Sequence, residues 1–132
     1  MEKIRVRRGK SRAGIGLFAT DTFLRGECVI EYTGEHITHE EADKRGGKYL
    51  FILDKKTVVD GKGRENLGRY INHSCKPNAE AEVDEDMQKI YIKAKRKIAI
   101  GEEITYDYGK EYWKEYIKPK GCMCDACIIS RA

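Results

Sequence analysis

The fold is decided by one stretch of the sequence, Arg69-Tyr70-Ile71-Asn72-His73-Ser74-Cys75-Lys76-Pro77-Asn78. An arginine, two asparagines, a histidine and a cysteine surround two apolar residues there. The stretch is too short and too punctuated for an ordinary helix or strand. Polar groups at this density usually serve a site. Taken singly, each also fits a plainer role, with Asn72 and Asn78 capping turns and His73 satisfied inside a core.

Short strands are indicated on both sides of this stretch. Strand patterns occur at Ile4 to Val6, at 27–32, at 49–53, at 57–60, and at the alternating Ile90, Ile92 and Ala94. The segments 49–53 and 57–60 form two arms around Asp54-Lys55-Lys56. Most of the chain is therefore predicted to be short strands joined by glycine-rich turns.

Two short helices are also predicted. Thr38-His39-Glu40-Glu41 has the T-x-x-E form of a capping box, so a helix should begin there, continue over 42–45 and end at Gly46-Gly47. A second helix is expected from 110 to about 117, closed by Pro119 and Gly121.

Composition favours one compact domain. The chain has 132 residues, of which 40% are hydrophobic and 36% charged, so it can bury a modest core under a charged surface. Its longest apolar runs fall far short of the ~20 residues of a membrane helix, so no membrane span is expected. The start Met1-Glu2-Lys3 has no apolar segment typical of a secretory signal, and we therefore expect an intracellular, reducing setting.

The net charge of +4 is unevenly distributed. Basic residues gather in two clusters: Lys3, Arg5, Arg7, Arg8, Lys10 and Arg12, then Lys93, Lys95, Arg96 and Lys97. Either cluster could attract an acidic partner or a nucleic acid, and both also fit solvated strand faces.

Three of the five cysteines form a C-x-C-x-x-C cluster, Cys122, Cys124 and Cys127. A structural zinc ion needs four thiolate or imidazole ligands, so a fourth must come from elsewhere. Cys75 is the natural candidate, because Cys28 lies in a hydrophobic strand run where a buried thiol is expected. A redox pair of Cys124 and Cys127 is the weaker alternative, since no βαβ unit surrounds it.

Two further patterns carry chemistry. In the segment 103–109, Tyr106 and Tyr108 share one face of a predicted strand and place two phenols side by side. In Gly14-Ile15-Gly16-Leu17-Phe18, two glycines let the backbone approach a ligand closely. Each pattern alone is a weak signal.

In their order and spacing, the four patterns resemble the SET-domain protein lysine methyltransferases. The resemblance runs from about Ile4 to Tyr108, includes Tyr32-Thr33-Gly34 after a strand, and resumes at the cysteine tail. It implies a mostly β fold of several small β-sheets with short helices around a knot-like core, in which the 72–73 segment passes through a neighbouring loop. It also implies a SET domain over 1–109 and a zinc-stabilised tail over 110–132. The insert between Thr38 and Tyr49, which often helps to select the peptide in the family, is minimal here.

The resemblance implies S-adenosylmethionine as cofactor and the side-chain amine of a protein lysine as methyl acceptor. Tyr108 then matches the catalytic phenol, with Tyr106 and Tyr32 lining the lysine channel and hydrogen-bonding the amine, and Tyr49 as a further channel residue. The residues expected to hold the cofactor are Gly14, Ile15, Gly16, Leu17, Arg69, Asn72, His73, Tyr108 and Trp113, although Trp113 fits a core position equally well. One structural zinc ion is expected at Cys75, Cys122, Cys124 and Cys127.

A histone or similar basic protein is the expected substrate, and Tyr106 implies mono- or dimethylation. A nuclear location is expected in a eukaryote and a cytoplasmic one in a prokaryote. Two other classes of function stay open: a catalytically silent module that recognises methyl-lysine by cation–π contact, and a nucleic-acid-binding protein that uses the basic N-terminus. The sequence does not distinguish a monomer from a homodimer.

Overall fold

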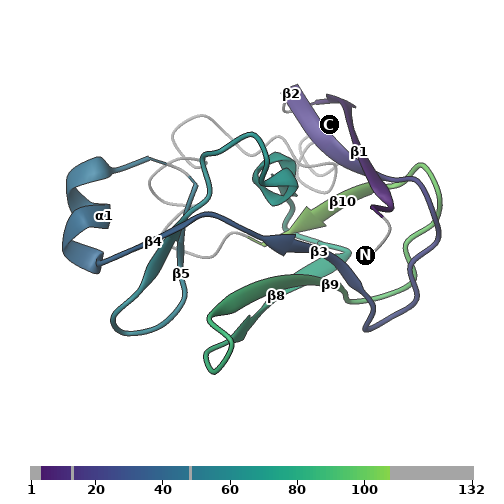
Figure 1. Ribbon diagram of the computed structural model, residues 1–132. Helices are drawn as coiled ribbons and strands as arrows, with labels where there is room; N and C mark the ends of the chain where they lie inside the picture. The colour runs from purple at the N-terminus through teal and green to yellow at the C-terminus, as the bar shows by residue number, and fades with distance from the viewer. Residues whose placement is uncertain (1–3, 13, 48, 108–132) are drawn as a thin grey trace.

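The computed structural model describes residues 4–12, 14–47 and 49–107. Figure 1 shows small sheets, with the short helix α1 at the end opposite the β1–β2 hairpin. The elements are β1 (Val6–Ser11), β2 (Gly14–Ala19), β3 (Cys28–Tyr32), β4 (Glu35–Ile37), α1 (His39–Arg45), β5 (Leu50–Ile52), β6 (Val58–Asp60), the 3₁₀ turn η1 (Leu67–Tyr70), β7 (Asn72–His73), β8 (Ala79–Asp84), β9 (Lys89–Ala94) and β10 (Glu103–Tyr106). The expected mostly β class with several small sheets is confirmed.

The strands form three sheets. Their orders are β1-β2-β10-β7, β3-β9-β8 and β4-β6-β5. Nearly all neighbours are antiparallel, as short connections favour, but β7 pairs with β10 in parallel. That pairing joins segments about thirty residues apart in the sequence and brings the Asn72-His73 dipeptide beside Thr105 and Tyr106.

The predicted strands form because their apolar residues face a shared core. Ile90 and Ile92 of β9 are fully buried and Ala94 nearly so, as the alternation of apolar and polar residues predicts. The largest core cluster lies between the first two sheets and includes Leu17, Phe23, Ile92 and Ile104. A second cluster of Tyr32, Leu53, Val59 and Ile90 joins the second sheet to the third.

Helix α1 begins and ends where the sequence predicts. Thr38 caps it, with its hydroxyl accepting the Glu41 backbone N–H at 3.1 Å. Gly46 closes it with a positive φ of 61° and donates its N–H to the carbonyl of Ala42. The two predicted arms likewise pair as the β5–β6 hairpin.

The prediction that Cys28 is buried is wrong. Cys28 is exposed, whereas Val29 and Tyr32 of the same strand are buried. A register shift between Cys28 and Ile30 interrupts the alternation of β3 against β9, and this bulge turns the thiol away from the core.

The predicted second helix at 110–117 lies outside the described residues, as does the cysteine tail. Within residues 4–12, 14–47 and 49–107, no helix has the length and apolar character needed to cross a membrane. The expected threading of the 72–73 segment through a loop stays a prediction, of which the parallel β7–β10 pair is the described part.

Two side chains fix β10 in place. Asn78, which is 2% exposed, accepts the Thr105 N–H at 2.9 Å and donates to the Glu103 carbonyl at 2.8 Å. Glu102 accepts the Ala99 N–H at 3.0 Å and the Asn78 amide at 3.2 Å, and it pairs with Arg96. Asn78 thus has a structural role, but through hydrogen bonds to the distant β10 backbone and not as the turn cap that its plainer interpretation predicts.

Burial by itself would raise the pKa of Glu102, but hydrogen bonds from Arg96, Ala99 and Asn78 outweigh it and lower the pKa below its ordinary value. A lowered pKa stabilises the fold above the unfolded-state pKa of ~4.3, and this stabilisation is lost as the pH falls through the folded-state value. We predict that Glu102→Gln lowers the free energy of unfolding by about 1–2 kcal/mol at pH 7 and that the difference shrinks below pH ~4. Urea unfolding at pH 7 and at a pH below ~4 measures this difference in the free energy of unfolding. The exposed Glu85→Gln is the matched control, and equal losses for the two variants would contradict the assignment.

Candidate functional site

The side-chain amide of Asn72 lies at the centre of the polar part of the site. Its nitrogen donates to Glu103 Oε2 at 2.8 Å, to the Ile15 carbonyl at 3.1 Å and to Ser11 Oγ at 3.2 Å. Ser11 in turn donates to the Glu103 carboxylate at 3.0 Å. We call these residues, Ser11, Ile15, Asn72 and Glu103, the amide–carboxylate cluster. It joins all four strands of the first sheet. No motif pattern included Ser11, and Glu103 opens the 103–109 segment but was given no role there.

Glycine is required at positions 14 and 16 for two different physical reasons. Gly14 has a φ of 110°, which side chains other than glycine rarely adopt, and no atom lies within 4 Å of where its Cβ would be. An added Cβ at Gly16 would lie 2.5 Å from Glu103 Oε2 and 3.0 Å from Ser11 Cβ, so Gly16 lets the carboxylate rest on the backbone. Ile15 is exposed and Leu17 fully buried, so Leu17 offers the site its backbone alone.

His73 lies beside the amide–carboxylate cluster on β7. Its side chain is 7% exposed, with Nδ1 3.8 Å from Asp107 Oδ1, and its Nε2 is 3.5 Å from the Cys75 thiol. Burial lowers the pKa of His73, and the nearby Asp107 opposes that shift only in part. The imidazole is therefore held mainly in its neutral form near pH 7.

The aromatic part of the site is a row of three rings. The centroids of Tyr32 and Phe51 are 5.3 Å apart, and those of Phe51 and Tyr106 are 6.3 Å apart with the rings nearly parallel at 23°. We call Tyr32, Phe51 and Tyr106 the aromatic row. The sequence predicted Tyr32 and Tyr106 for this region but missed Phe51. Its position two residues after Tyr49 on one strand was the available signal.

Tyr32 and Tyr49 are joined through a main-chain group. The Tyr32 hydroxyl donates to the Tyr49 carbonyl at 2.6 Å, and the same carbonyl accepts the Gly61 N–H at 2.9 Å. The Tyr32 oxygen has therefore used its proton and remains an acceptor. An added Cβ at Gly61 would lie 2.5 Å from the Tyr32 ring, so the ring packs directly on the backbone.

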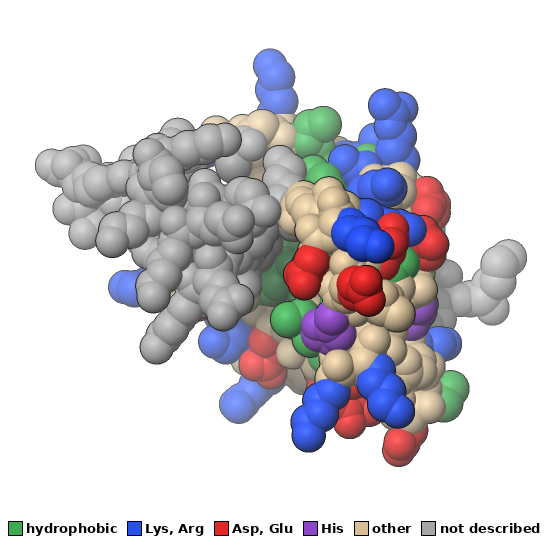
Figure 2. Space-filling view, turned by 90° about the vertical axis from the view of Figure 1, so that its left-hand side faces the viewer, with side chains coloured by type: hydrophobic (Ala, Val, Ile, Leu, Met, Phe, Trp, Pro, Cys, Tyr) green, Lys and Arg blue, Asp and Glu red, His purple; other side chains and the backbone are tan. Residues whose placement is uncertain are grey.

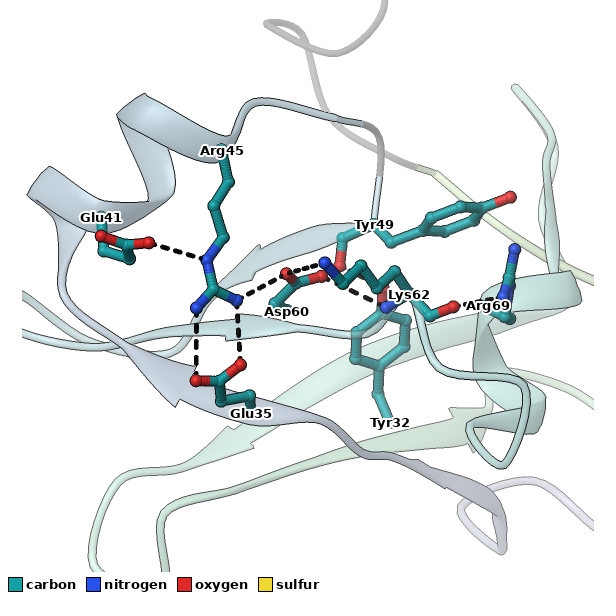
Figure 3. Close-up of polar contacts among 8 residues, drawn as sticks. All are labelled: Tyr32, Glu35, Glu41, Arg45, Tyr49, Asp60, Lys62 and Arg69. Atoms are coloured by element: carbon teal, nitrogen blue, oxygen red, sulfur yellow. Dashed lines mark hydrogen bonds and ion pairs between the residues drawn. The ribbon is translucent and has the colours of Figure 1, made fainter.

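Arg69, predicted to hold a cofactor, makes its described contacts on the tyrosine side. Its guanidinium lies 4.4 Å from the Tyr49 ring centroid and 5.3 Å from that of Tyr70, and its Nη1 donates to the Lys62 carbonyl. Figure 3 shows the Tyr49 ring directed toward Arg69. A hydrogen bond with Tyr49 raises the pKa of Arg69 against the opposing effect of burial. Arg69 Nε is buried without a hydrogen-bond partner among the described residues.

Asn66 fastens the Tyr32-Thr33-Gly34 motif to the turn after β6. It is 1% exposed, accepts the Thr33 N–H at 3.0 Å and donates to the Gly61 carbonyl at 2.9 Å. The motif analysis did not single out Asn66, although it opens the segment that leads into the deciding stretch.

Several predicted site residues lie outside the described residues. They are Tyr108, Trp113, Cys122, Cys124 and Cys127. Of the predicted zinc ligands only Cys75 is described, and it is exposed. The described ranges contain no cluster of three or more side chains able to hold a metal ion, so the zinc site stays a prediction.

Many residues of the basic clusters have intramolecular partners. Arg5 pairs with Asp21 at 3.1 Å and with Glu27 at 3.0 Å, and Lys93 pairs with Glu82 at 2.9 Å. The face on the α1 side carries charges of both signs, interspersed (Figure 2). These contacts favour the solvated-face interpretation of the two clusters.

A separate hollow lies along the β8–β9 hairpin. It is lined by Glu82, Val83, Asp84, Glu85, Asp86, Tyr91 and Lys93. It contains none of the predicted site residues, and we do not assign it to the candidate site.

The site therefore has two halves that meet at the β7–β10 pair. The amide–carboxylate cluster offers acceptors and an open glycine backbone, and the aromatic row offers a partly buried aromatic wall. Small sheets joined in this way, with these two halves, fit the fold and the site that the resemblance to the SET-domain family implies.

Direct comparison identifies the same class. The SET domain family matches residues 14–109, more than two thirds of the chain. This chain belongs to the SET-domain family.

The chain is similar to several curated histone methyltransferases. It is 47% identical over 104 residues to histone-lysine N-methyltransferase set1 of Dictyostelium discoideum, covering 70% of this chain and 7% of that protein. It is 42% identical over 118 residues to histone-lysine N-methyltransferase SETD1A of Homo sapiens, covering 80% of this chain and 7% of that protein. It is 38% identical over 122 residues to the "H3 lysine-4 specific" enzyme of Saccharomyces cerevisiae, covering 84% of this chain and 11% of that protein. The chain thus spans about a tenth or less of the length of these relatives.

Proposed function

We propose that this chain transfers methyl groups from S-adenosylmethionine to the side-chain amine of a lysine in a protein. The observation that carries the proposal is the register of β7 on β10, which sets Tyr106 opposite His73 and Thr105 opposite Asn72. This register places one end of the aromatic row directly beside the amide–carboxylate cluster. A methyl donor held by the cluster and an amine held by the row would then be neighbours, as group transfer requires.

The residues of the amide–carboxylate cluster fit the amino-acid end of S-adenosylmethionine. The Ile15 carbonyl and the Glu103 carboxylate are acceptors that suit the ammonium of an amino acid, and Asn72 holds both in place. The backbone at Gly14 is open to a ligand. S-adenosylmethionine supplies an activated methyl group on a cationic sulfonium. We assign the amino-acid end of the cofactor to Gly14–Leu17 with Asn72 and His73, whereas Arg69, by its contacts, supports Tyr49.

The aromatic row prepares the acceptor. A lysine amine has an ordinary pKa of ~10.4 and is protonated at pH 7. Aromatic walls exclude water and disfavour the ammonium, and a nearby cationic centre acts in the same direction. The Tyr32 hydroxyl donates a hydrogen bond to the Tyr49 carbonyl, so its oxygen can accept an N–H of the amine and orient the lone pair of the amine.

Histones are the substrate class that the relatives favour. The three relatives are named as histone-lysine methyltransferases, one of them specific for lysine 4 of histone H3. We propose a histone tail as substrate and, with it, a nuclear location. A catalytically silent methyl-lysine reader is less favoured, because the amide–carboxylate cluster has no part in reading. A nucleic-acid function is less favoured because Arg5, Lys93 and Arg96 already hold carboxylates.

The direct test is methyl transfer from labelled S-adenosylmethionine to a synthetic peptide of the histone H3 N-terminus. We predict that the full chain methylates this peptide and that Tyr108→Phe, which removes one phenol oxygen, lowers kcat by on the order of 10² to 10³. Tyr91→Phe, on β9 and outside the site, should keep the wild-type rate.

A Tyr108→Phe protein with near-normal turnover would remove Tyr108 from the catalytic role. A wild type that methylates no lysine in histone or other protein substrates would contradict the proposed activity itself.

A second prediction concerns the number of methyl groups. The Tyr106 hydroxyl can hold the amine or a water molecule and so hinders a methylated amine from turning toward a new methyl group. The wild type should stop at mono- or dimethyl-lysine, and Tyr106→Phe should shift the product to higher states, because the ring packed on Phe51 is kept. A mass-spectrometric time course measures this. Trimethyl product from the wild type, or no shift in the variant, would show that another residue sets the limit.

We also propose one structural zinc ion per chain, held by Cys75 and the three tail cysteines, and a division into a SET domain over 1–109 and a tail over 110–132. Three clustered thiolates need a fourth ligand, and the Cys75 thiol is exposed beside the site. Elemental analysis should find one zinc per chain in the wild type and a reduced content in Cys75→Ser, with wild-type content in Cys28→Ser. Full, tightly held zinc in Cys75→Ser would overturn the ligand set.

A further inference from the structure

Arg45, the last residue of α1, holds three carboxylates from three elements. Its Nη1 lies 2.9 Å from Glu35 Oε1 on β4 and 3.0 Å from Asp60 Oδ2 on β6. Its Nη2 lies 3.3 Å from Glu35 Oε2, and its Nε lies 3.0 Å from Glu41 Oε1. All three guanidinium nitrogens are therefore occupied, as Figure 3 shows.

The charge distribution makes this arrangement specific to arginine. Hydrogen bonds with Glu35, Glu41 and Asp60 raise the pKa of Arg45, and the same contact lowers the pKa of Glu35. A planar fork can reach three carboxylates at once, whereas the ammonium of a lysine is a single point charge.

Of the three carboxylates, Asp60 depends most on the positive charge of Arg45. Its side chain is 6% exposed, whereas those of Glu35 and Glu41 are 63% and 43% exposed. A carboxylate that is this deeply buried requires a cationic partner. Lys62 also approaches Asp60, but at 3.9 Å and with a side chain that is 71% exposed, so Arg45 is the principal counter-charge.

Asp60 leads directly to the aromatic side of the site. It is the last residue of β6, the central strand of the third sheet, and pairs there with Leu50 of β5 and Glu35 of β4. The next residue, Gly61, donates its N–H to the Tyr49 carbonyl that also accepts the Tyr32 hydroxyl. The residue after that, Lys62, accepts at its carbonyl from Arg69, whose guanidinium stacks on Tyr49.

We propose that Arg45 is a positioning residue for the lysine side of the site: by holding Asp60 it fixes β5 and β6, and with them Tyr49 and Phe51. The described contacts of the Arg45 guanidinium are with Glu35, Glu41 and Asp60, and none is with a residue of the aromatic row or of the amide–carboxylate cluster. The inference rests on the proposed methyl transfer. Because the amide–carboxylate cluster belongs to another sheet, Arg45 acts on the binding of the lysine peptide and not on that of S-adenosylmethionine.

Two variants and one control test this. Arg45→Lys keeps the charge but loses the fork. The double variant Arg45→Met, Asp60→Asn removes both charges, so that no buried carboxylate is left unpaired and the fold is retained. The control is Lys44→Met on the neighbouring position, whose pair with Glu40 is exposed at 3.8 Å. The probes are the histone H3 peptide, S-adenosylmethionine alone by calorimetry, and hydrogen exchange of the full chain.

We expect both Arg45 variants to raise the KM for the peptide by about tenfold with a smaller change in kcat, since the loss lies in substrate placement. The Kd for S-adenosylmethionine should stay within about twofold of the wild type. Amide exchange should accelerate at Leu50–Ile52 and Gly61 and stay unchanged in β2 and β10. Lys44→Met should match the wild type in every measurement.

An unchanged peptide KM in both variants, on an active wild type, would overturn the inference while leaving the proposed function intact. Equal losses in peptide and S-adenosylmethionine binding would also overturn it, because they indicate general loosening. A wild type with no transfer would instead overturn the proposed function and the positioning role with it. Hydrogen exchange would then still decide whether Arg45 holds β5.

Discussion

Two short segments that are far apart in the sequence pair in parallel, and the rest of the site depends on that pairing. β7 has only two residues, Asn72 and His73, yet it lies against β10 with Thr105 and Tyr106 as its partners. A two-residue strand contributes few ladder bonds of its own, so its position is maintained by side chains. The two N–H groups of the Asn72 amide lie within hydrogen-bond distance of three acceptors on its neighbours. The buried Asn78 holds the adjoining β10 backbone through Thr105 and Glu103. The polar residues of the deciding stretch therefore act first as the structural link and then as the site.

From this link the two halves extend into different sheets. In the half that we propose for the methyl donor, Gly16 allows Glu103 to lie against the backbone, and Leu17 anchors β2 in the main core. The proposed lysine half takes one ring from each sheet, with Tyr32 on β3, Phe51 on β5 and Tyr106 on β10. Its Phe51 part belongs to the small β4-β6-β5 sheet, where Arg45 holds Asp60. Tyr32 connects the two, since it ends β3, packs with Ile90 and donates to Tyr49.

Local features of the fold could be predicted from the sequence, and features that depend on distant pairing could not. The Thr38 cap, the end at Gly46 and the β5–β6 hairpin follow from neighbouring residues, and all three are confirmed. Phe51, Ser11 and Arg45 belong to the site or its support only because the strands bring them there, and no motif marks them. Glu103 lies within a motif, but its contact with Asn72 depends on the pairing of distant strands. Cys28 was misjudged because an alternating pattern does not reveal a bulge. The family could be recognised from the sequence because its motifs contain residues that this distant pairing brings together, such as Asn72 and Thr105.

The central claim is that the aromatic row and the amide–carboxylate cluster hold the two reactants side by side. The most direct measurement is a crystal structure of the full chain with S-adenosylhomocysteine and a lysine-containing histone H3 peptide. The account predicts the amino-acid end of the nucleoside product at Ile15 and Glu103, with the lysine side chain against Tyr32, Phe51 and Tyr106. A lysine bound instead in the acidic hollow of the β8–β9 hairpin, or a nucleoside away from the Gly14–Leu17 backbone, would contradict it.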